Sequence, residues 1–152
     1  MPRQPWAETR VVIVAARFHA ALTQALVRGA RRTLRRAGIL PQHLDIIWVP
    51  GAFELPVVAS HVAHSHRAPD AIVAVGVLIR GETVQHEVIA HAVAQGLGAV
   101  SVATGLPVTF GVIVADTLEQ AKARAGGRVG NRGAEAAMAA LAVLNVFKKC
   151  NV

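Results

Sequence analysis

The sequence predicts an α/β fold, a three-layer α/β/α sandwich in which a four-stranded parallel sheet lies between two layers of helices. Apolar segments of strand length alternate with segments of helical periodicity along the chain. The segment 71–79 is apolar almost throughout, which is typical of a strand covered on both faces. The chain has 152 residues, of which 53% are hydrophobic, and this size and composition predict one domain over 1–152.

The first part of the chain predicts two strands separated by a helix. Val11–Ala15 is a run of β-branched and small apolar residues, and a helical pattern follows over 20–37. Gly38 ends this pattern, and Leu44–Val49 is the second apolar strand segment. The order at this point is strand, helix, strand.

The remainder of the chain repeats the alternation. The predicted elements are a helix over about 56–66, a strand over 71–79, a helix over about 83–96, a strand over 108–115, a helix from Asp116-Thr117 and an alanine-rich helix after Gly133. Such an order implies right-handed crossovers and a doubly wound, flavodoxin-like arrangement.

The charge balance raises the question of a nucleic-acid partner, because 16 Lys and Arg against 9 Asp and Glu give +7. The aromatic content argues against one, since two Trp, four Phe and no Tyr offer few platforms for stacked bases. Five arginines within 28–36 have the spacing of one outer helix face. We therefore expect a solvated basic face and no nucleic-acid partner.

Hydropathy and cysteine content indicate the compartment. The longest purely apolar stretches, such as Val11–Ala16, are of strand length, whereas a spanning helix needs about 20 residues. No secretory signal is visible, and the single cysteine, Cys150, cannot form an intrachain disulfide. We predict a cytoplasmic protein that binds no membrane.

Candidate ligand-binding segments follow the predicted strands, because parallel sheets bind ligands at the carboxyl ends of their strands. They are Arg17–His19, Pro50–Glu54, Arg80–Thr83 and the glycine-rich connection Arg124–Gly133. Arg80–Thr83 opens a helix, so its free backbone N–H groups and the helix dipole suit a phosphate-sized anion. An ordinary helix cap at Thr83 is the alternative.

Two further segments are open to more than one interpretation. The prolines of Pro50–Pro56 would hold Phe53 and Glu54 at the end of the second strand. The alternative places Phe53 in the core and Glu54 as a cap of the next helix. Three arginines spaced four residues apart in 124–133 suit phosphate, although such loops are often only flexible surface.

The histidines do not form a pattern typical of a metal site. His86 and His91 are five residues apart, about 140° around a helix, so they cannot share one ion. His61, His64 and His66 lie on a polar helix face without cysteine or carboxylate partners. We predict no metal.

These segments together resemble one family, lumazine synthase (6,7-dimethyl-8-ribityllumazine synthase). The resemblance covers nearly the whole chain and is carried by residues 16–18, 50–56, 79–83, 107–111 and 124–137. It implies condensation of 5-amino-6-ribitylaminouracil with 3,4-dihydroxy-2-butanone 4-phosphate, the penultimate step of riboflavin biosynthesis, through imine formation, phosphate elimination and ring closure. It also implies that no metal or organic cofactor takes part, and that the protein is a homo-oligomer built of pentamers.

The resemblance assigns a role to each site residue. It implies that Phe18 stacks on the pyrimidine, and that Phe110 closes the site from a neighbouring subunit. Arg132 would contact the pyrimidine where the family usually has a lysine. The ribityl chain would be held by Ala52, Phe53 and Glu54, the ring edge by Val77, Leu78 and Ile79, and the phosphate by Gly81, Glu82, Thr83 and Arg124.

One residue departs from the family's usual pattern. Gln85 stands where the resemblance implies a proton-transferring histidine, and His86 comes one residue later. A shift of one residue turns a helical side chain by about 100°. We predict that His86 is the nearest proton carrier, that Gln85 only forms hydrogen bonds, and that Arg124 completes the catalytic set.

Because of Gln85, two alternatives to an active enzyme stay open. One is a catalytically weakened protein that binds flavins or pteridines, and the other is a paralogue whose function is shell formation. A binder of ribityl compounds has little need of a phosphate site, so Arg124 and the Arg80–Thr83 segment favour the enzyme.

Overall fold

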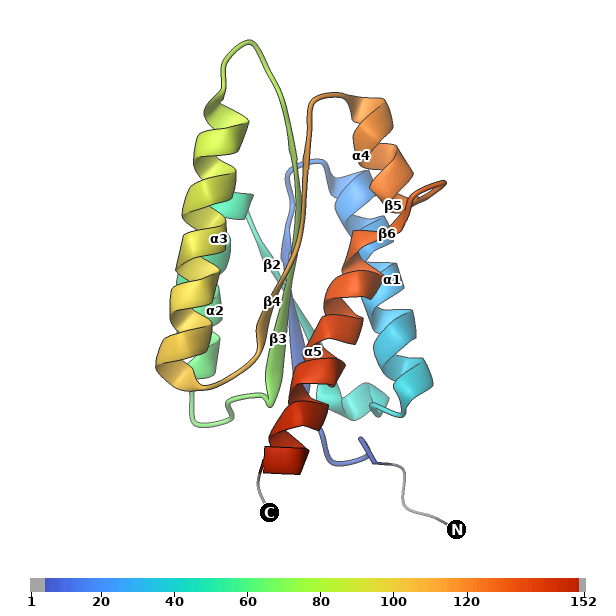
Figure 1. The fold of residues 1–152 in the computed structure, drawn as a ribbon, viewed down its shortest axis with the longest axis vertical. Coiled ribbons are helices and arrows are strands. Elements are labelled where there is room, and N and C mark those ends of the chain that lie inside the picture. Colours follow the sequence, from blue (N-terminus) through green and yellow to red (C-terminus); the bar gives the residue numbers. More distant parts are fainter. Residues whose placement is uncertain (1–4, 151–152) are drawn as a thin grey trace.

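The computed structural model describes residues 5–150 and consists of three layers (Figure 1). Four parallel strands in the order β2-β1-β3-β4 form the middle layer. They are β1 Val11–Ala16, β2 Leu44–Val49, β3 Ala71–Ile79 and β4 Val108–Ala115. The predicted parallel sheet is confirmed, while both ends of the predicted domain 1–152 lie outside the described residues.

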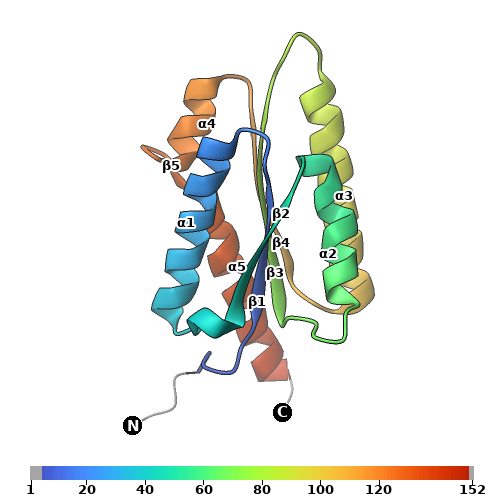
Figure 2. The same cartoon turned by 180° about the vertical axis from the view of Figure 1, so that it is seen from behind.

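Helices cover both faces of this sheet, as the two opposite views show (Figures 1 and 2). One face is covered by α1 Ala20–Ala37, α4 Leu118–Arg124 and α5 Arg132–Cys150, and the other by α2 Leu55–Ala63 and α3 Gln85–Thr104. The smaller elements are the hairpin strands β5 Ala125–Gly127 and β6 Gly130–Asn131 and two single 3-10 turns, Pro41–His43 and Ala52–Glu54. The three-layer α/β/α sandwich is confirmed.

The core lies on both sides of β1, whose six residues are all buried. Ile13 belongs to the hydrophobic cluster beneath α1 and α5, and Val12 and Val14 belong to the cluster beneath α2 and α3. Burying a Val or Ile side chain contributes about 1.5–3 kcal/mol. A strand that packs on both faces therefore has no polar positions, which explains why β1 is an uninterrupted apolar run.

Helix α3 is longer than predicted, because Gly96 does not end it. A Cβ built on Gly96 would lie 2.8 Å from Cβ of Pro56, so the glycine allows α2 and α3 to approach closely. The helix ends at Gly105, which has φ 72° and whose N–H donates to the Ser101 carbonyl. Gly96 therefore marks a close contact between two helices and not the end of a helix.

Helix α2 covers a shorter range than the predicted 56–66. It begins at Leu55 and ends at Ala63, and the His64 N–H and ring Nδ1 both bond the Ser60 carbonyl oxygen, at 3.1 Å and 2.7 Å. The bond from the His64 N–H still has helical spacing, whereas the Ser65 N–H donates three residues back to the Val62 carbonyl at 3.2 Å, so the chain tightens there and the helix ends.

The predicted glycine-rich connection is the β5–β6 hairpin, and α5 begins at Arg132, one residue before Gly133. The Asn131 side chain donates to the Ala25 carbonyl of α1 at 3.0 Å and accepts from the Ala134 N–H at 3.0 Å. Asn131 thus caps α5 and joins it to α1.

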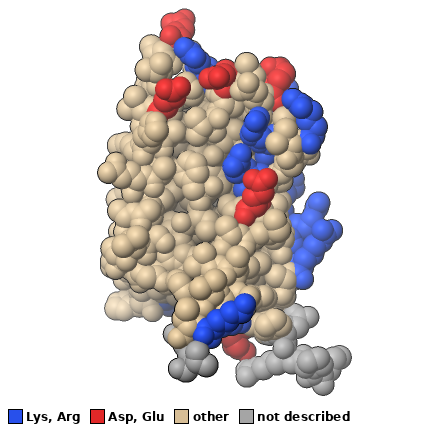
Figure 3. Space-filling model, viewed as in Figure 1, with Lys and Arg blue, Asp and Glu red and all other residues tan. Residues whose placement is uncertain are grey.

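The outer face of α1 is basic, as predicted. Leu26, Ala30 and Leu34 are fully buried on its inner face. Lys and Arg gather on the side of the molecule where α1 and α4 lie, whereas the side over α3 is nearly free of charge along its length (Figure 3). The exposed arginines are Arg28, Arg31, Arg32, Arg35 and Arg36.

Candidate active site

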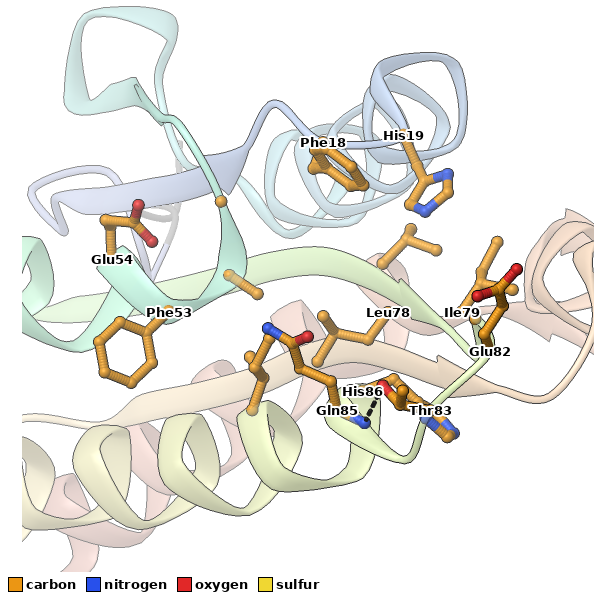
Figure 4. A pocket seen from close by; sticks show the side chains of 15 residues that line it. Phe18, His19, Phe53, Glu54, Leu78, Ile79, Glu82, Thr83, Gln85 and His86 are labelled. Atoms are coloured by element: carbon orange, nitrogen blue, oxygen red, sulfur yellow. Dashed lines mark hydrogen bonds between the residues drawn. The ribbon is translucent and has the colours of Figure 1, made fainter.

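A cavity of about 540 Å³ lies at the carboxyl ends of the strands and is closed on one side by the start of α3 (Figure 4). Phe18 and His19 line it from the segment after β1 and Gln85 from α3, while Phe53 borders it from the segment after β2 with its ring turned away from Phe18. Parallel strands end at one edge of a sheet, so segments far apart in the sequence meet there.

Most residues singled out from the sequence line this cavity. They are Phe18, Ala52, Phe53, Glu54, Val77, Leu78, Ile79, Gly81, Glu82, Thr83, Gln85 and His86. The hydrophobic end of β3 forms the floor, and the polar side chains come from the connecting segments. The arrangement suits a flat ring on an apolar floor with hydrogen-bonding substituents at its ends.

The segment between β2 and α2 places Phe53 at the border of the cavity. Ala52 is 5% exposed and packs into the core, whereas Phe53 is 64% exposed. The Glu54 side chain makes no cap hydrogen bond at the start of α2 within the described chain. The alternative of a core Phe53 and a capping Glu54 is therefore wrong, and both side chains are free to meet a ligand.

The polar end of the cavity is the N-terminus of α3. Thr83 Oγ1 accepts a hydrogen bond from the Gln85 N–H at 3.4 Å, and the N-cap residue itself is Val84. A Cβ built on Gly81 would meet no described atom within 4 Å, so an anion can approach this backbone. Helix N–H groups and the positive end of the helix dipole favour negative charge at such a position.

Gln85 and His86 point in different directions. Gln85 extends into the cavity, and His86 lies beside Thr83 at its wall (Figure 4). The His86 side chain is 4% exposed, and its Nε2 is 3.7 Å from Asp116 Oδ1. Its buried Nδ1 has no partner among the described atoms. Arg80 Nη1 is 4.0 Å from the same Asp116 oxygen, so Asp116 links the start of α3 to the end of β3.

Three predicted site residues, Phe110, Arg124 and Arg132, do not line the cavity of their own chain. Phe110 lies on the edge strand β4 and is 38% exposed. Arg124 Nη1 donates to the Gln120 carbonyl of its own helix at 3.1 Å. Arg132 Nε is 3.5 Å from Glu135 Oε2. These three residues would therefore contact a ligand only outside the cavity of their own chain.

Three lining residues received no role in the sequence analysis: His19, Gly51 and Ile89. His19 comes directly after Phe18, in the segment that follows β1 at the ligand-binding edge of the sheet. This position is the sequence signal that could have identified it as a lining residue. Gly51 and Ile89 adjoin assigned residues and carry no chemical signal of their own. Among residues 5–150, no three His, Cys, Asp or Glu side chains are grouped so as to hold a metal ion.

Comparison with known proteins gives one family. The model of 6,7-dimethyl-8-ribityllumazine synthase matches residues 8–148. Relatives with that name include the Leuconostoc mesenteroides protein, 40% identical over 92% of this chain and 89% of its own length. The Halorhodospira halophila protein is 42% identical over 93% of this chain and 90% of its own, and the Gemmatimonas aurantiaca protein is 47% identical over 92% and 85%. The chain, with its cavity at the carboxyl edge of a parallel sheet, belongs to the 6,7-dimethyl-8-ribityllumazine synthase family.

Proposed function

We propose that this protein condenses 5-amino-6-ribitylaminouracil with 3,4-dihydroxy-2-butanone 4-phosphate to form 6,7-dimethyl-8-ribityllumazine, the penultimate step of riboflavin biosynthesis. The observation that carries the proposal is the cavity, which brings an aromatic side chain, an apolar floor and a helix N-terminus together in one space. The three relatives, each named 6,7-dimethyl-8-ribityllumazine synthase, support the same reaction.

The apolar part of the cavity holds the pyrimidine. Phe18 is 69% exposed at the cavity mouth, so its ring is available to stack on a flat ligand. The edge of the pyrimidine lies along the end of β3, at Val77, Leu78 and Ile79. The ribityl chain lies against Ala52 and Phe53, and Glu54 accepts hydrogen bonds from its hydroxyls.

The butanone phosphate occupies the polar end. Gly81, Glu82 and Thr83 provide backbone and hydroxyl donors beside the N-terminus of α3. Arg124 adds a guanidinium, which pairs with phosphate more strongly than a neutral donor does. Holding both substrates in one cavity replaces a bimolecular encounter by an oriented one, and the cationic end stabilises the departing phosphate.

His86 is the proton carrier proposed from the sequence. Its Nε2 is 3.7 Å from Asp116 Oδ1 and its Nδ1 has no partner among the described atoms, so Nδ1 is the ring nitrogen to which we assign the proton exchange. Gln85 extends into the cavity and acts through its amide as a hydrogen-bonding group only.

The direct test mixes the purified protein with both substrates and follows lumazine fluorescence. Lumazine should form faster than in the protein-free mixture at saturating substrate, because the cavity fixes the two reactants together. A rate equal to that of the protein-free mixture, with retained binding of the ribityl pyrimidine, would instead identify a binding protein.

The proposal includes self-association into pentamers. Helix α3 is long and apolar enough to cross a membrane by length and composition alone, and its most apolar 18-residue window is only 11% buried. Val57, Val88 and Val102 on α2 and α3 are 67%, 64% and 88% exposed. A second copy that covers this uncharged face, seen in Figure 3, would remove its apolar surface from water. Pentamers could stand alone, pair, or assemble into a sixty-subunit icosahedral shell.

The positions of Phe110, Arg124 and Arg132 support the same assembly, because these side chains do not line their own cavity. We place them in the cavity of a neighbouring subunit. The cytoplasm is the compartment that fits this enzyme, and the exposed, unpaired Cys150 agrees with a reducing environment.

Mixed oligomers test the shared site. Co-expression of Arg124→Ala chains with Phe18→Ala/Glu54→Ala chains should restore activity to about a quarter of wild type. Each proposed site takes Phe18 and Glu54 from one chain and Arg124 from its neighbour, so random assembly leaves about a quarter of the sites intact. Activity no higher than that of the two separate variants would contradict a shared site. Light scattering on the wild type gives the assembly size, and an active 15.9 kDa monomer would also contradict it.

A further inference from the structure

His19 is the histidine whose position in the cavity the proposed mechanism does not use. It lies directly after Phe18, and the two rings meet edge to face, with centroids 5.1 Å apart and an interplanar angle of 87°. Its side chain is half-buried and lines the cavity. In Figure 4 the imidazole lies between Phe18 and the side of the cavity formed by Glu82 and Thr83.

The backbone of His19 is held in an uncommon conformation. Its φ of 59° and ψ of 51° are left-handed, and among residues 5–150 it is the one non-glycine residue with positive φ. Glycine would adopt this conformation without the steric cost that a Cβ brings. Strain of this kind is kept mainly where a particular side chain serves a site.

The position does not serve the helix. His19 is the N-cap residue of α1, yet its side chain makes no cap hydrogen bond within the described chain. Asn, Asp or Ser at an N-cap would bond the helix N–H groups and stabilise it by about 1 kcal/mol. The side chain at position 19 is therefore explained better by the cavity that it lines than by the helix that it precedes.

The two cavity histidines differ in what they face. The His86 imidazole is buried at the wall with Nε2 beside Asp116. The His19 imidazole faces the space between the proposed pyrimidine position at Phe18 and the proposed phosphate position at Thr83. The reacting amine and ketone must meet in that space, since each substrate is fixed from its own side.

We propose that His19 is a second proton-transfer residue of this site, acting where the pyrimidine amine meets the ketone; the inference rests on the proposed function. As the C–N bond forms, the neutral imidazole accepts a proton from the attacking nitrogen and delivers it to the former carbonyl oxygen, which gives the neutral carbinolamine. As the C–O bond of the carbinolamine breaks, the imidazole relays the second proton from the nitrogen to the same oxygen, which leaves as water. The imine forms and His19 ends in its starting state, so no further reactant is required.

Other charged groups face the same space and must be separated from His19 in a pH profile. Glu54 comes from the turn after β2, Glu82 from the segment after β3 and His86 from α3. Arg17 precedes Phe18 in the segment after β1 but does not line this cavity. Removal of His19 leaves these groups unchanged, so a pH effect that disappears with His19 belongs to its imidazole.

The test compares three variants at the same substrate concentrations over a range of pH. His19→Asn keeps a residue that tolerates left-handed backbone, so the fold should be retained. His19→Gly removes the side chain and leaves space for imidazole added to the solution. His66→Asn makes the same change at an exposed histidine between α2 and β3, remote from the cavity, and serves as the matched control.

We expect His19→Asn to lower kcat about 100-fold, the scale of general acid–base catalysis, and to flatten the pH dependence of kcat near neutrality. The Kd for a phosphate-free ribityl pyrimidine analogue should change by less than about threefold, because stacking on Phe18 remains. Imidazole should raise the kcat of His19→Gly. His66→Asn should match the wild type in all of these measurements.

Two results would overturn the inference while leaving the proposed function intact. One is a wild-type kcat and pH profile in His19→Asn. The other is a loss confined to ligand binding, with no imidazole rescue of His19→Gly, which would make His19 a positioning residue only. A wild-type protein that forms no lumazine would instead overturn the proposed function, and this inference with it.

Discussion

Replacement of Arg124 by alanine should lower kcat/KM for the phosphorylated ketone about 100-fold. A hydrogen bond to a charged group contributes about 1.5–3 kcal/mol, and a guanidinium can make two of them to one phosphate. Arg124 is free to do so, because its only described hydrogen bond is to the Gln120 carbonyl, four residues earlier in its own helix. The variant should lose affinity for the phosphorylated ketone and keep its affinity for the ribityl pyrimidine.

The measurement is steady-state lumazine formation, accompanied by binding of a phosphate-free ribityl pyrimidine analogue. Arg31→Ala is the matched control, since Arg31 is an exposed arginine on the outer face of α1 and does not line the cavity. Its kcat/KM should stay within about twofold of wild type, the scale of exposed charge effects. Equal losses of catalysis and of analogue binding in Arg124→Ala would show that Arg124 does not pair with the phosphate.

Replacement of Gly133 by alanine should destabilise the fold by about 3 kcal/mol, at the upper end for overpacking. A Cβ built on Gly133 would lie 2.1 Å from the Leu26 carbonyl oxygen, an atom of the α1 backbone that cannot rotate away. Helices α1 and α5 would have to separate. Their separation would also lengthen the Asn131 hydrogen bond to the Ala25 carbonyl, now 3.0 Å.

Gly98→Ala is the control for this prediction, because Gly98 lies inside α3 and a Cβ there would meet no described atom within 4 Å. Alanine in the middle of a helix is more favourable than glycine, so this variant should gain about 0.5–1 kcal/mol. Guanidinium unfolding at one fixed protein concentration measures both variants, since association shifts apparent stability. Equal midpoints for Gly133→Ala and wild type would contradict the packing argument.

The strands could be predicted from local residues alone. β1 and β3 are apolar at nearly every position, and a strand needs such a run only when helices cover both of its faces. The alternation with helical segments then limits the sheet to a parallel order and places the ligand edge at its carboxyl end. For this reason Phe18, Phe53 and Thr83, which follow three different strands, line one cavity in the structure.

Helix boundaries depended on neighbours that no local pattern contains. Gly96 looks like a helix end, but in the structure it allows the close approach of Pro56 on α2. Gly133 likewise allows α5 to lie against Leu26 of α1. Glycine thus follows the end of α3 at Gly105, and it permits close packing within α3 at Gly96 and within α5 at Gly133. The positive φ of Gly105 and the short distances from Gly96 and Gly133 to another helix distinguish these cases.

The sequence by itself determined the fold class, through the order and composition of its segments, and its motifs carried the resemblance that indicated the family and most of the cavity lining. The tertiary structure decided where side chains point. It directs His86 toward Asp116, gives His19 a left-handed backbone at the cavity, and leaves Arg124 outside the cavity of its own chain. These directions depend on contacts between segments far apart in the chain, and a one-residue shift at Gln85 and His86 turns a side chain by about 100°.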